Sequence, residues 1–126
     1  MHEDRTLDAL RDIAAGFDTH DLDRIMRHVA PDAVFEAPRG PERCGERFEG
    51  HEAIAGAFRG RFETIPDVRY RDDTHFVAGD RGASEWTLTG TTRDGAHLDV
   101  HGCDLWTLRD GLVIKKNSFW KIRTGS

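Results

Sequence analysis

The sequence predicts an α+β fold in which a curved antiparallel sheet wraps around three N-terminal helices and leaves an internal pocket. Helical periodicity is confined to the first half of the chain, whereas residues 68–122 alternate apolar and polar side chains with a period of two. The pairs Asp94-Gly95 and Asp110-Gly111 separate three of these alternating segments. Asp-Gly is a strong hairpin signal, because both turn residues must tolerate positive φ.

Three segments carry the spacing of amphipathic helices. The first covers Thr6–Asp18, and the second is a short helix with Asp21 as its expected N-cap and Pro31 near its end. The third begins around Gly50 and is stopped by Pro66. The apolar positions of the three helices are Leu7, Leu10, Ile13, Ala14 and Phe17; Leu22, Ile25, Met26 and Val29; and Ile54, Ala57, Phe58, Phe62 and Ile65.

The strands are predicted as one short segment and four long ones. The short strand, Ala33–Ala37, lies between the second and third helices and ends at Pro38. Arg39–Glu49, which follows it, is rich in Gly, Pro and charged residues, and this composition predicts a loop. The long strands are expected over residues 68–78, 83–92, 97–109 and 112–122.

Length and composition narrow the class of protein. The 126 residues are predicted to form one domain, 1–126, with a single core, and 37% hydrophobic and 33% charged residues are typical of a soluble globular chain. No apolar run is long enough to span a membrane and no leader is visible, so we expect no membrane contact and a cytoplasmic location. The net charge of −5, with Arg and Asp mixed along the chain, disfavours a nucleic-acid partner. Cys44 and Cys103 lack metal-site spacing, and a disulfide is not expected.

The hairpin turns predict which side chains share a face of the sheet. If Asp94-Gly95 is a two-residue turn, Glu85 pairs with Asp104. One face then carries Glu85, Thr87, Thr89, Val100, Gly102, Asp104, Trp106 and Leu108, and the other carries Trp86, Leu88, His101, Cys103 and Leu105. On the last strand Ile114, Lys116, Ser118 and Trp120 share a face. A slip of one residue would exchange these assignments.

Asp104 is the first candidate for chemistry. A carboxyl group on an inner face beside Trp106 and Trp120 would be desolvated, and a desolvated carboxyl can exchange protons with a carbonyl compound. Glu85, expected opposite, would complete an acid and base pair, because two facing carboxyls do not both ionise readily. Lys116 would neutralise one carboxyl or polarise a substrate carbonyl. The alternative is a structural salt-bridged cluster of the same three residues.

The remaining candidate site residues would line the internal pocket. Aromatic residues would form an apolar wall and hydroxyl groups would bind the ligand, although core packing is the alternative for the aromatic rings. These candidate substrate-binding residues are Phe17, Phe35, Phe58, Thr87, Thr89, Trp106, Ser118 and Trp120. The expected ligand is small and either apolar or aromatic.

His97, Asp99 and His101 are metal-ligand types on one strand face. Alternate residues of a strand are about 7 Å apart and converge poorly on one ion, so no metal is predicted, and no cofactor is expected. This second face of the sheet is also partly apolar, which favours a homodimer formed through it.

Four stretches of the chain resemble the SnoaL-like branch of the nuclear-transport-factor-two-like superfamily. They are DLDRIMRHVAPDAVFEAP, GHEAIAGAF, EWTLTGT and GCDLWTLRDGLVIKKNSFWK. The resemblance implies a cone-shaped α+β barrel with three helices, and a dimer through the outer sheet face. Members include polyketide cyclases, ketosteroid isomerases, scytalone dehydratase, limonene epoxide hydrolases and pocket proteins of no known activity, so fold alone does not determine the reaction.

Some functional positions of the family are matched in this sequence and others are not. Ala37 stands where ketosteroid isomerases have their general base, whereas Asp104, in DLWTL, fits the carboxylic acid of the later sheet. Glu85, Thr87 and Ser118 stand where epoxide hydrolases need an Arg-x-Asp pair and a further Asp, which disfavours that activity. Two hypotheses remain. The first is a cofactor-independent cyclase, isomerase or dehydratase acting on an apolar carbonyl compound; the second is a non-catalytic small-molecule-binding or dimeric accessory module.

Overall fold

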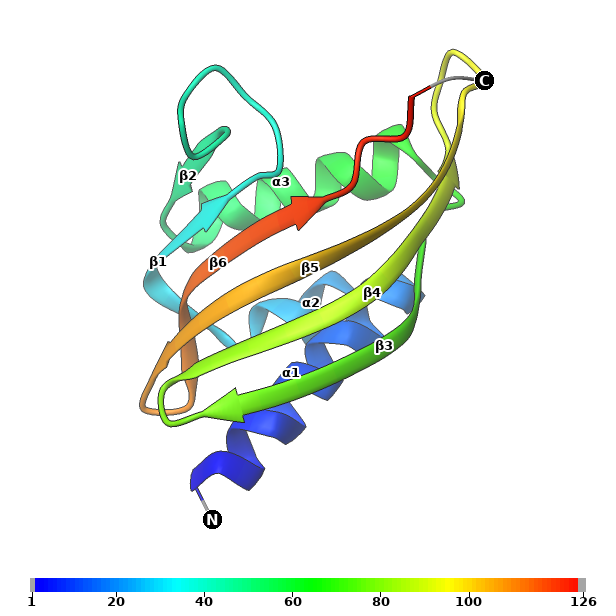
Figure 1. The fold of residues 1–126 in the computed structure, drawn as a ribbon. Coiled ribbons are helices and arrows are strands. Elements are labelled where there is room, and N and C mark those ends of the chain that lie inside the picture. The colour runs from blue at the N-terminus through cyan, green and yellow to red at the C-terminus, as the bar shows by residue number, and fades with distance from the viewer. Residues whose placement is uncertain (1, 125–126) are drawn as a thin grey trace.

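Three helices cover one face of a curved six-stranded sheet in the computed structural model, which describes residues 2–124 (Figure 1). The helices are α1 (His2–Thr19), α2 (Leu22–Met26) and α3 (His51–Thr64). The strands are β1 (Val29–Glu36), β2 (Arg47–Glu49), β3 (Arg69–Ala78), β4 (Arg81–Thr91), β5 (His97–Arg109) and β6 (Leu112–Trp120). Their order is β2-β1-β6-β5-β4-β3, and the sheet is antiparallel except where β1 pairs with β6. The predicted α+β class is confirmed.

Helices α1 and α3 pack apolar faces against the sheet, and α2 packs against both of these helices. In α1, Leu10, Ile13 and Phe17 are buried, as their spacing predicts. Asp21 caps α2 as expected, because its side chain accepts a hydrogen bond from the backbone N–H of Arg24 at 3.1 Å. The larger of two apolar clusters fills the space between all three helices and strands β1, β5 and β6. The smaller cluster, which contains Ile65, Val68, Trp86 and Leu88, lies beside it under β4.

The segment between α2 and α3 differs from the prediction. The second helix ends at Met26 rather than near Pro31, and β1 has already begun at Val29. Pro31 lies where the pairing of β1 with β6 shifts register, a position that does not need a backbone N–H donor. The predicted loop also contains β2, which pairs with β1. Both differences arise because strand pairing with distant residues overrides local preference.

The hairpin between β4 and β5 has a three-residue loop, so the predicted register is wrong by one residue. The backbone N–H of Gly95 donates to Thr92 O at 3.0 Å, and that of Thr92 donates to Ala96 O at 2.9 Å. Gly95 has a φ of 87°, which is typical of a type I turn closed by a glycine bulge. Asp104 therefore faces Ser84 rather than Glu85, and both faces of β4 are exchanged.

The hairpin between β5 and β6 follows the prediction. Arg109 pairs with Leu112 around a two-residue turn, in which Asp110 and Gly111 have φ values of 54° and 80°. The inner face of β5 carries Asp104 and Trp106, as expected. One bulge later in β6 shifts the pairing between Thr107 and Leu108, so Val113 is buried as well as Lys116.

Candidate active site

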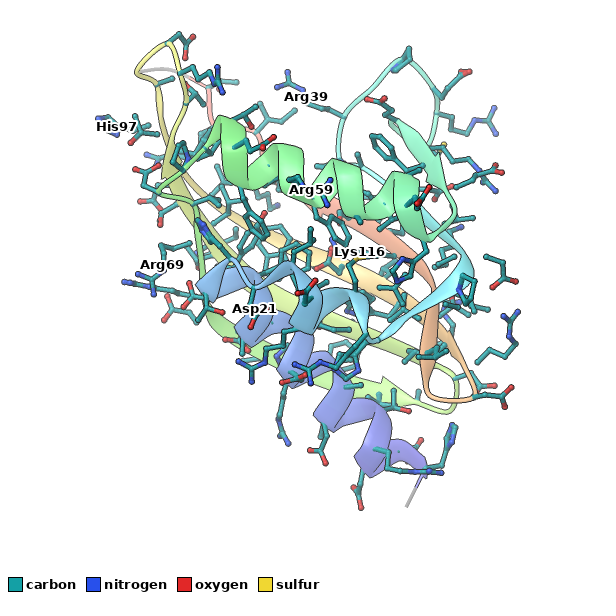
Figure 2. All side chains as sticks on the ribbon, turned by 180° about the vertical axis from the view of Figure 1, so that it is seen from behind. Asp21, Arg39, Arg59, Arg69, His97 and Lys116 are labelled. Carbon is teal, nitrogen blue, oxygen red and sulfur yellow. The ribbon has the colours of Figure 1, made fainter. Side chains whose placement is uncertain are left out.

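A cavity of about 200 Å³ lies between the inner face of the sheet and the helices α1 and α3. We call it the main cavity. Its lining residues are Phe17, Phe35, Ala37, Pro38, Arg39, Glu46, Phe48, Ala57, Phe58, Arg61, Tyr70, Trp86, Lys116, Ser118 and Trp120. Figure 2 shows Lys116 in the interior between α3 and the sheet, whereas Arg39 extends from the loop after β1. The wall is therefore mostly aromatic and carries a small number of polar groups.

A buried cluster of hydrogen-bonded polar side chains lies at the inner end of this wall. Lys116 Nζ donates hydrogen bonds to Asp104 Oδ1 at 2.8 Å and to Ser118 Oγ at 2.6 Å, and Ser118 Oγ donates to the same carboxylate oxygen. Trp86 Nε1 donates to Asp104 Oδ2 at 2.8 Å. The residues are only 5% (Asp104), 8% (Lys116), 5% (Ser118) and 6% (Trp86) exposed. Both carboxylate oxygens are thus held in fixed orientations by three donors from two neighbouring strands.

The Lys116 ammonium group is enclosed by aromatic rings. Its Nζ lies 4.7 Å from the ring centre of Phe35, 5.2 Å from that of Phe17 and 5.6 Å from those of Phe58 and Trp106. Ring faces attract a cation, but less strongly than water solvates it. Burial lowers the pKa of Lys116, and the Asp104 carboxylate offsets part of this effect.

A second, smaller void lies behind the cluster and measures about 20 Å³. Asp104 lines this small void and not the main cavity, whereas Lys116 lines both. A space of this size holds a single water molecule. Any ligand in the main cavity therefore meets Lys116 and Ser118 directly, and it reaches Asp104 through them.

Tyr70 and Arg61 add two further polar groups to the main cavity. Burial raises the pKa of Tyr70 to about 12, so its hydroxyl keeps its proton and can donate to a ligand oxygen. Arg61, from α3, stacks over Trp120 with its guanidinium carbon 4.7 Å from the ring centre. The cavity therefore offers hydrogen-bond donors and positive charge to an electron-rich ligand.

A separate polar array runs across β3, β4 and β5. Asp73 Oδ2 lies 2.6 Å from His75 Nε2, His75 Nδ1 lies 2.7 Å from Ser84 Oγ, and Trp106 Nε1 donates to that hydroxyl at 2.9 Å. The order of carboxylate, imidazole and hydroxyl is that of a nucleophile triad. However, Ser84 is 3% exposed and borders only the small void, which has no room for an acyl group. The array instead fixes the Trp106 ring against the cluster.

Three of the predicted site residues lie on the other face of the sheet. Glu85 is exposed, accepts a hydrogen bond from the Thr74 hydroxyl at 3.3 Å, and pairs with Cys103 rather than Asp104. Thr87 and Thr89 share its face. The glycine bulge at the β4–β5 turn is the physical reason for this correction. Trp86, expected on the outer face, occupies the inward position instead.

The other predicted residues do come together. Phe17, Phe35, Phe58, Lys116, Ser118 and Trp120 line the main cavity, and Asp104 and Trp106 line the small void. The inward positions of Trp86, Ser84 and His75, and the position of Arg61 in the cavity wall, were not predicted from the sequence. The signal for Trp86 is the composition of β4 itself, in which Trp86 and Leu88 alternate with the polar Glu85 and Thr87.

Within residues 2–124 the structure shows neither a metal-binding cluster nor a membrane-spanning helix. No group of three His, Cys, Asp or Glu side chains in this range is arranged to hold a metal ion. His97, Asp99 and His101 are exposed and lie on one side of β5. None of the helices in the same range is both long and apolar enough to cross a membrane.

Comparisons with known proteins agree with this fold. The family model described as SnoaL-like domain matches residues 10–116. A candidate polyketide cyclase from Xanthomonas campestris pv. campestris superposes with a TM-score of 0.85 at 17% identity, over 96% of this chain and 93% of that one. An NTF2-like protein of unknown function from Mesorhizobium loti has a TM-score of 0.79 at 26% identity, over 96% and 94%. TerC, co-crystallized with polyporic acid, has a TM-score of 0.77 at 21% identity, over 93% and 92%. No curated protein sequence matches the chain.

Proposed function

The chain belongs to the SnoaL-like domain family, and from this premise we propose that it is a cofactor-independent acid/base enzyme acting on a small aromatic carbonyl compound. The observation that carries the proposal is the buried cluster in which Lys116 and Ser118 line the main cavity and Asp104 lies behind them. The reaction class is proton transfer next to a carbonyl group, as in an isomerisation, cyclisation or dehydration.

The ligand class follows from the size and lining of the main cavity. A cavity of about 150 Å³ is sufficient for benzene, so the 200 Å³ here suits a single substituted aromatic ring. Phe17, Phe35 and Phe58 supply apolar contact, and Tyr70 supplies a donor for an oxygen atom. The organic ligand of TerC supports a small-molecule occupant.

In the proposed chemistry two residues of the cluster contact the substrate and a third lies behind them. Lys116 and Ser118 contact the substrate, and Asp104 stands behind them within hydrogen-bond distance of both. When the substrate loses a proton from the carbon next to its carbonyl group, the Ser118 oxygen accepts it while the Ser118 hydroxyl proton passes to Asp104. Lys116 stabilises the negative charge that develops on the carbonyl oxygen.

A ligand-binding module without chemistry is the second candidate function. The observation in its favour is that Asp104 already accepts hydrogen bonds from Lys116, Ser118 and Trp86, which is the arrangement of a structural ion pair. Ala37, at the position of the isomerase base, lines the main cavity without a functional group. Such a module would return a bound carbonyl compound unchanged.

Deuterium exchange into acetophenone separates the two functions without knowledge of the natural substrate. Acetophenone has one aromatic ring and exchangeable protons next to its carbonyl group. We expect the protein to accelerate exchange of these protons in D2O, followed by NMR, and Asp104→Asn to abolish the acceleration. Glu85→Gln is the matched control, because it removes a carboxylate from the outer face and should exchange at the full rate. Binding of acetophenone without accelerated exchange would favour the binding module.

The outer face of the sheet is proposed as a homodimer interface. Three large apolar side chains are exposed on this face. Leu105 of β5 is 38% exposed, Phe119 of β6 is 48% exposed and Phe76 of β3 is 62% exposed. Large exposed apolar side chains on one sheet face are typical of a surface that a second copy covers. We also propose a cytoplasmic location for the protein.

A further inference from the structure

Lys116 is the ionisable group of the cluster that a ligand in the main cavity meets first. Its side chain lines both the main cavity and the small void, whereas Asp104 lines only the small void. The proposed function uses Lys116 as a charge, yet a lysine amine at the end of an aromatic cavity also has the position of a nucleophile toward carbonyl carbon.

We propose that Lys116 forms an imine with aromatic aldehydes and ketones that enter the main cavity. This inference rests on the proposed function only in its choice of a carbonyl ligand, and it is independent of proton abstraction by Asp104. It assigns to this chain a covalent step that uses the Lys116 side chain itself.

The first requirement is that Lys116 can give up its proton. Four aromatic rings lie within 5.6 Å of Nζ, and burial lowers its pKa. Asp104 from β5 acts in the opposite direction, while the positive charge of Arg61 from α3 lowers the pKa further. Tyr70 from β3 stays protonated and neutral, and Asp73 from the same strand lines the small void.

The second requirement is a group that accepts and returns the proton. Asp104 Oδ1 lies 2.8 Å from Lys116 Nζ and can take a proton from the ammonium group, which converts a buried ion pair into a neutral amine and acid. Trp86 holds the other carboxylate oxygen, so Oδ1 stays directed at Nζ. Ser118 accepts a hydrogen bond from Nζ and keeps the amine on the cavity side.

The bond changes balance without any further reactant. The Lys116 amine adds to the carbonyl carbon, a proton moves from the newly bonded nitrogen to the carbonyl oxygen, and the product is a carbinolamine. Asp104 then gives the proton that it took from the ammonium group to this hydroxyl group, which leaves as water while the nitrogen electron pair forms the C=N bond. The product is a protonated imine attached to Lys116 and paired with the Asp104 carboxylate, and its hydrolysis by the reverse steps restores the starting ion pair.

Reductive trapping with benzaldehyde tests the inference on the protein as it is. The sequence contains only three lysines, Lys115, Lys116 and Lys121, so peptide mass mapping resolves every side-chain amine. The protein is incubated at neutral pH with benzaldehyde and cyanoborohydride, which reduces an imine to a stable benzyl amine. We expect Lys116 to be benzylated faster than either other lysine, because burial lowers its pKa and leaves more of it as free amine at neutral pH.

Lys115 is the matched control, since it is the adjacent residue and its side chain is 44% exposed and paired with Glu36 at 3.4 Å. Lys115→Arg should leave labelling at Lys116 unchanged, Lys116→Arg should abolish it, and Asp104→Asn should slow it. Equal or slower labelling of Lys116 relative to Lys115 in the wild-type protein would overturn the inference, whatever the variants do.

The two proposals fail separately. Labelling of Lys116 without acetophenone exchange would support the imine and remove acid/base catalysis. Exchange without labelling would do the reverse. Absence of both, with no quenching of tryptophan fluorescence by benzaldehyde, would overturn both.

Discussion

Replacement of Asp104 by asparagine tests how strongly the buried ion pair of Asp104 and Lys116 is desolvated. Asparagine keeps the shape of the side chain but removes the negative charge 2.8 Å from Lys116 Nζ. Lys116, which is 8% exposed, then remains as a cation among aromatic rings with Ser118 as its polar neighbour. Breaking a buried pair on one side costs about 3–5 kcal/mol. We expect Asp104→Asn to lower the free energy of unfolding by this amount at pH 7, measured by urea denaturation.

The loss should decrease as the pH rises. Burial lowers the pKa of Lys116 in the folded protein, whereas a lysine in the unfolded chain has a pKa of about 10.4. Between these two pKa values the unfolded state binds more protons, so the free energy of unfolding increases with pH. The same gain applies to the wild-type protein, but there the Asp104 carboxylate raises the pKa of Lys116. The variant therefore gives up the Lys116 proton at a lower pH, and the loss decreases between the folded-state pKa of the variant and that of the wild type.

Two further variants complete the experiment. Asp104→Leu combined with Lys116→Met removes both charges and should recover most of the lost stability, because an apolar pair of similar volume is often equivalent. Glu85→Gln alters an exposed carboxylate and should leave the urea midpoint unchanged. A loss below about 1 kcal/mol in Asp104→Asn, the range of surface ion pairs, would refute the reasoning, as would a loss that is independent of pH.

Three other predictions concern the sheet. Trp86→Phe removes the indole donor to Asp104 and should lower the free energy of unfolding by about 1.5–3 kcal/mol in urea, and an unchanged value would place Trp86 outside the core. Gly102→Ala should cost about 1–3 kcal/mol in the same assay, because its Cβ would lie 2.4 Å from the Trp86 ring, whereas Gly60→Ala, in an open position of α3, should stabilise the protein. Phe119→Asp with Leu105→Asp should convert a dimer into a monomer in sedimentation equilibrium, and a wild-type protein that is monomeric at every concentration would contradict the proposed interface.

The turn between β5 and β6 could be predicted from the sequence because Asp110-Gly111 closes a two-residue loop. Asp110 and Gly111 both adopt positive φ, as an Asp-Gly pair in such a turn requires. Counting from this turn alone would place Asp104 opposite Asn117, and the bulge between Thr107 and Leu108 moves it opposite Ser118. The shared face of Asp104, Lys116 and Ser118 therefore depends on a bulge that the turn residues do not specify.

The face of β4 was predicted wrongly because Asp-Gly also closes a three-residue loop. In that loop only Gly95 needs positive φ, and the pairing moves by one residue. Local sequence does not distinguish the two loops, but the burial pattern does, since Trp86 and Leu88 are buried and Glu85 is exposed. The inward turn of His75 depends on a second irregularity, at Asp72, whose φ of 56° interrupts the pairing of β3 with β4.

The parallel pairing of β1 with β6 could not be predicted from local pattern. The paired segments are far apart in the chain, as Phe35 and Lys116 show, and nothing in either segment specifies the other. This pairing places Phe35 over the Lys116 ammonium group, so the aromatic enclosure of Lys116 is a property of the tertiary structure.

The proposed function requires a carbonyl compound to bind in the main cavity beside Lys116. The chain has three tryptophans, and their indole N–H signals report on the site, because Trp86 and Trp120 line the main cavity while Trp106 faces the small void. Titration with acetophenone, followed by NMR of these three signals, tests the claim most directly. We predict saturable shifts of Trp86 and Trp120 that are larger than that of Trp106. Unchanged signals for Trp86 and Trp120 at saturating acetophenone would contradict the account.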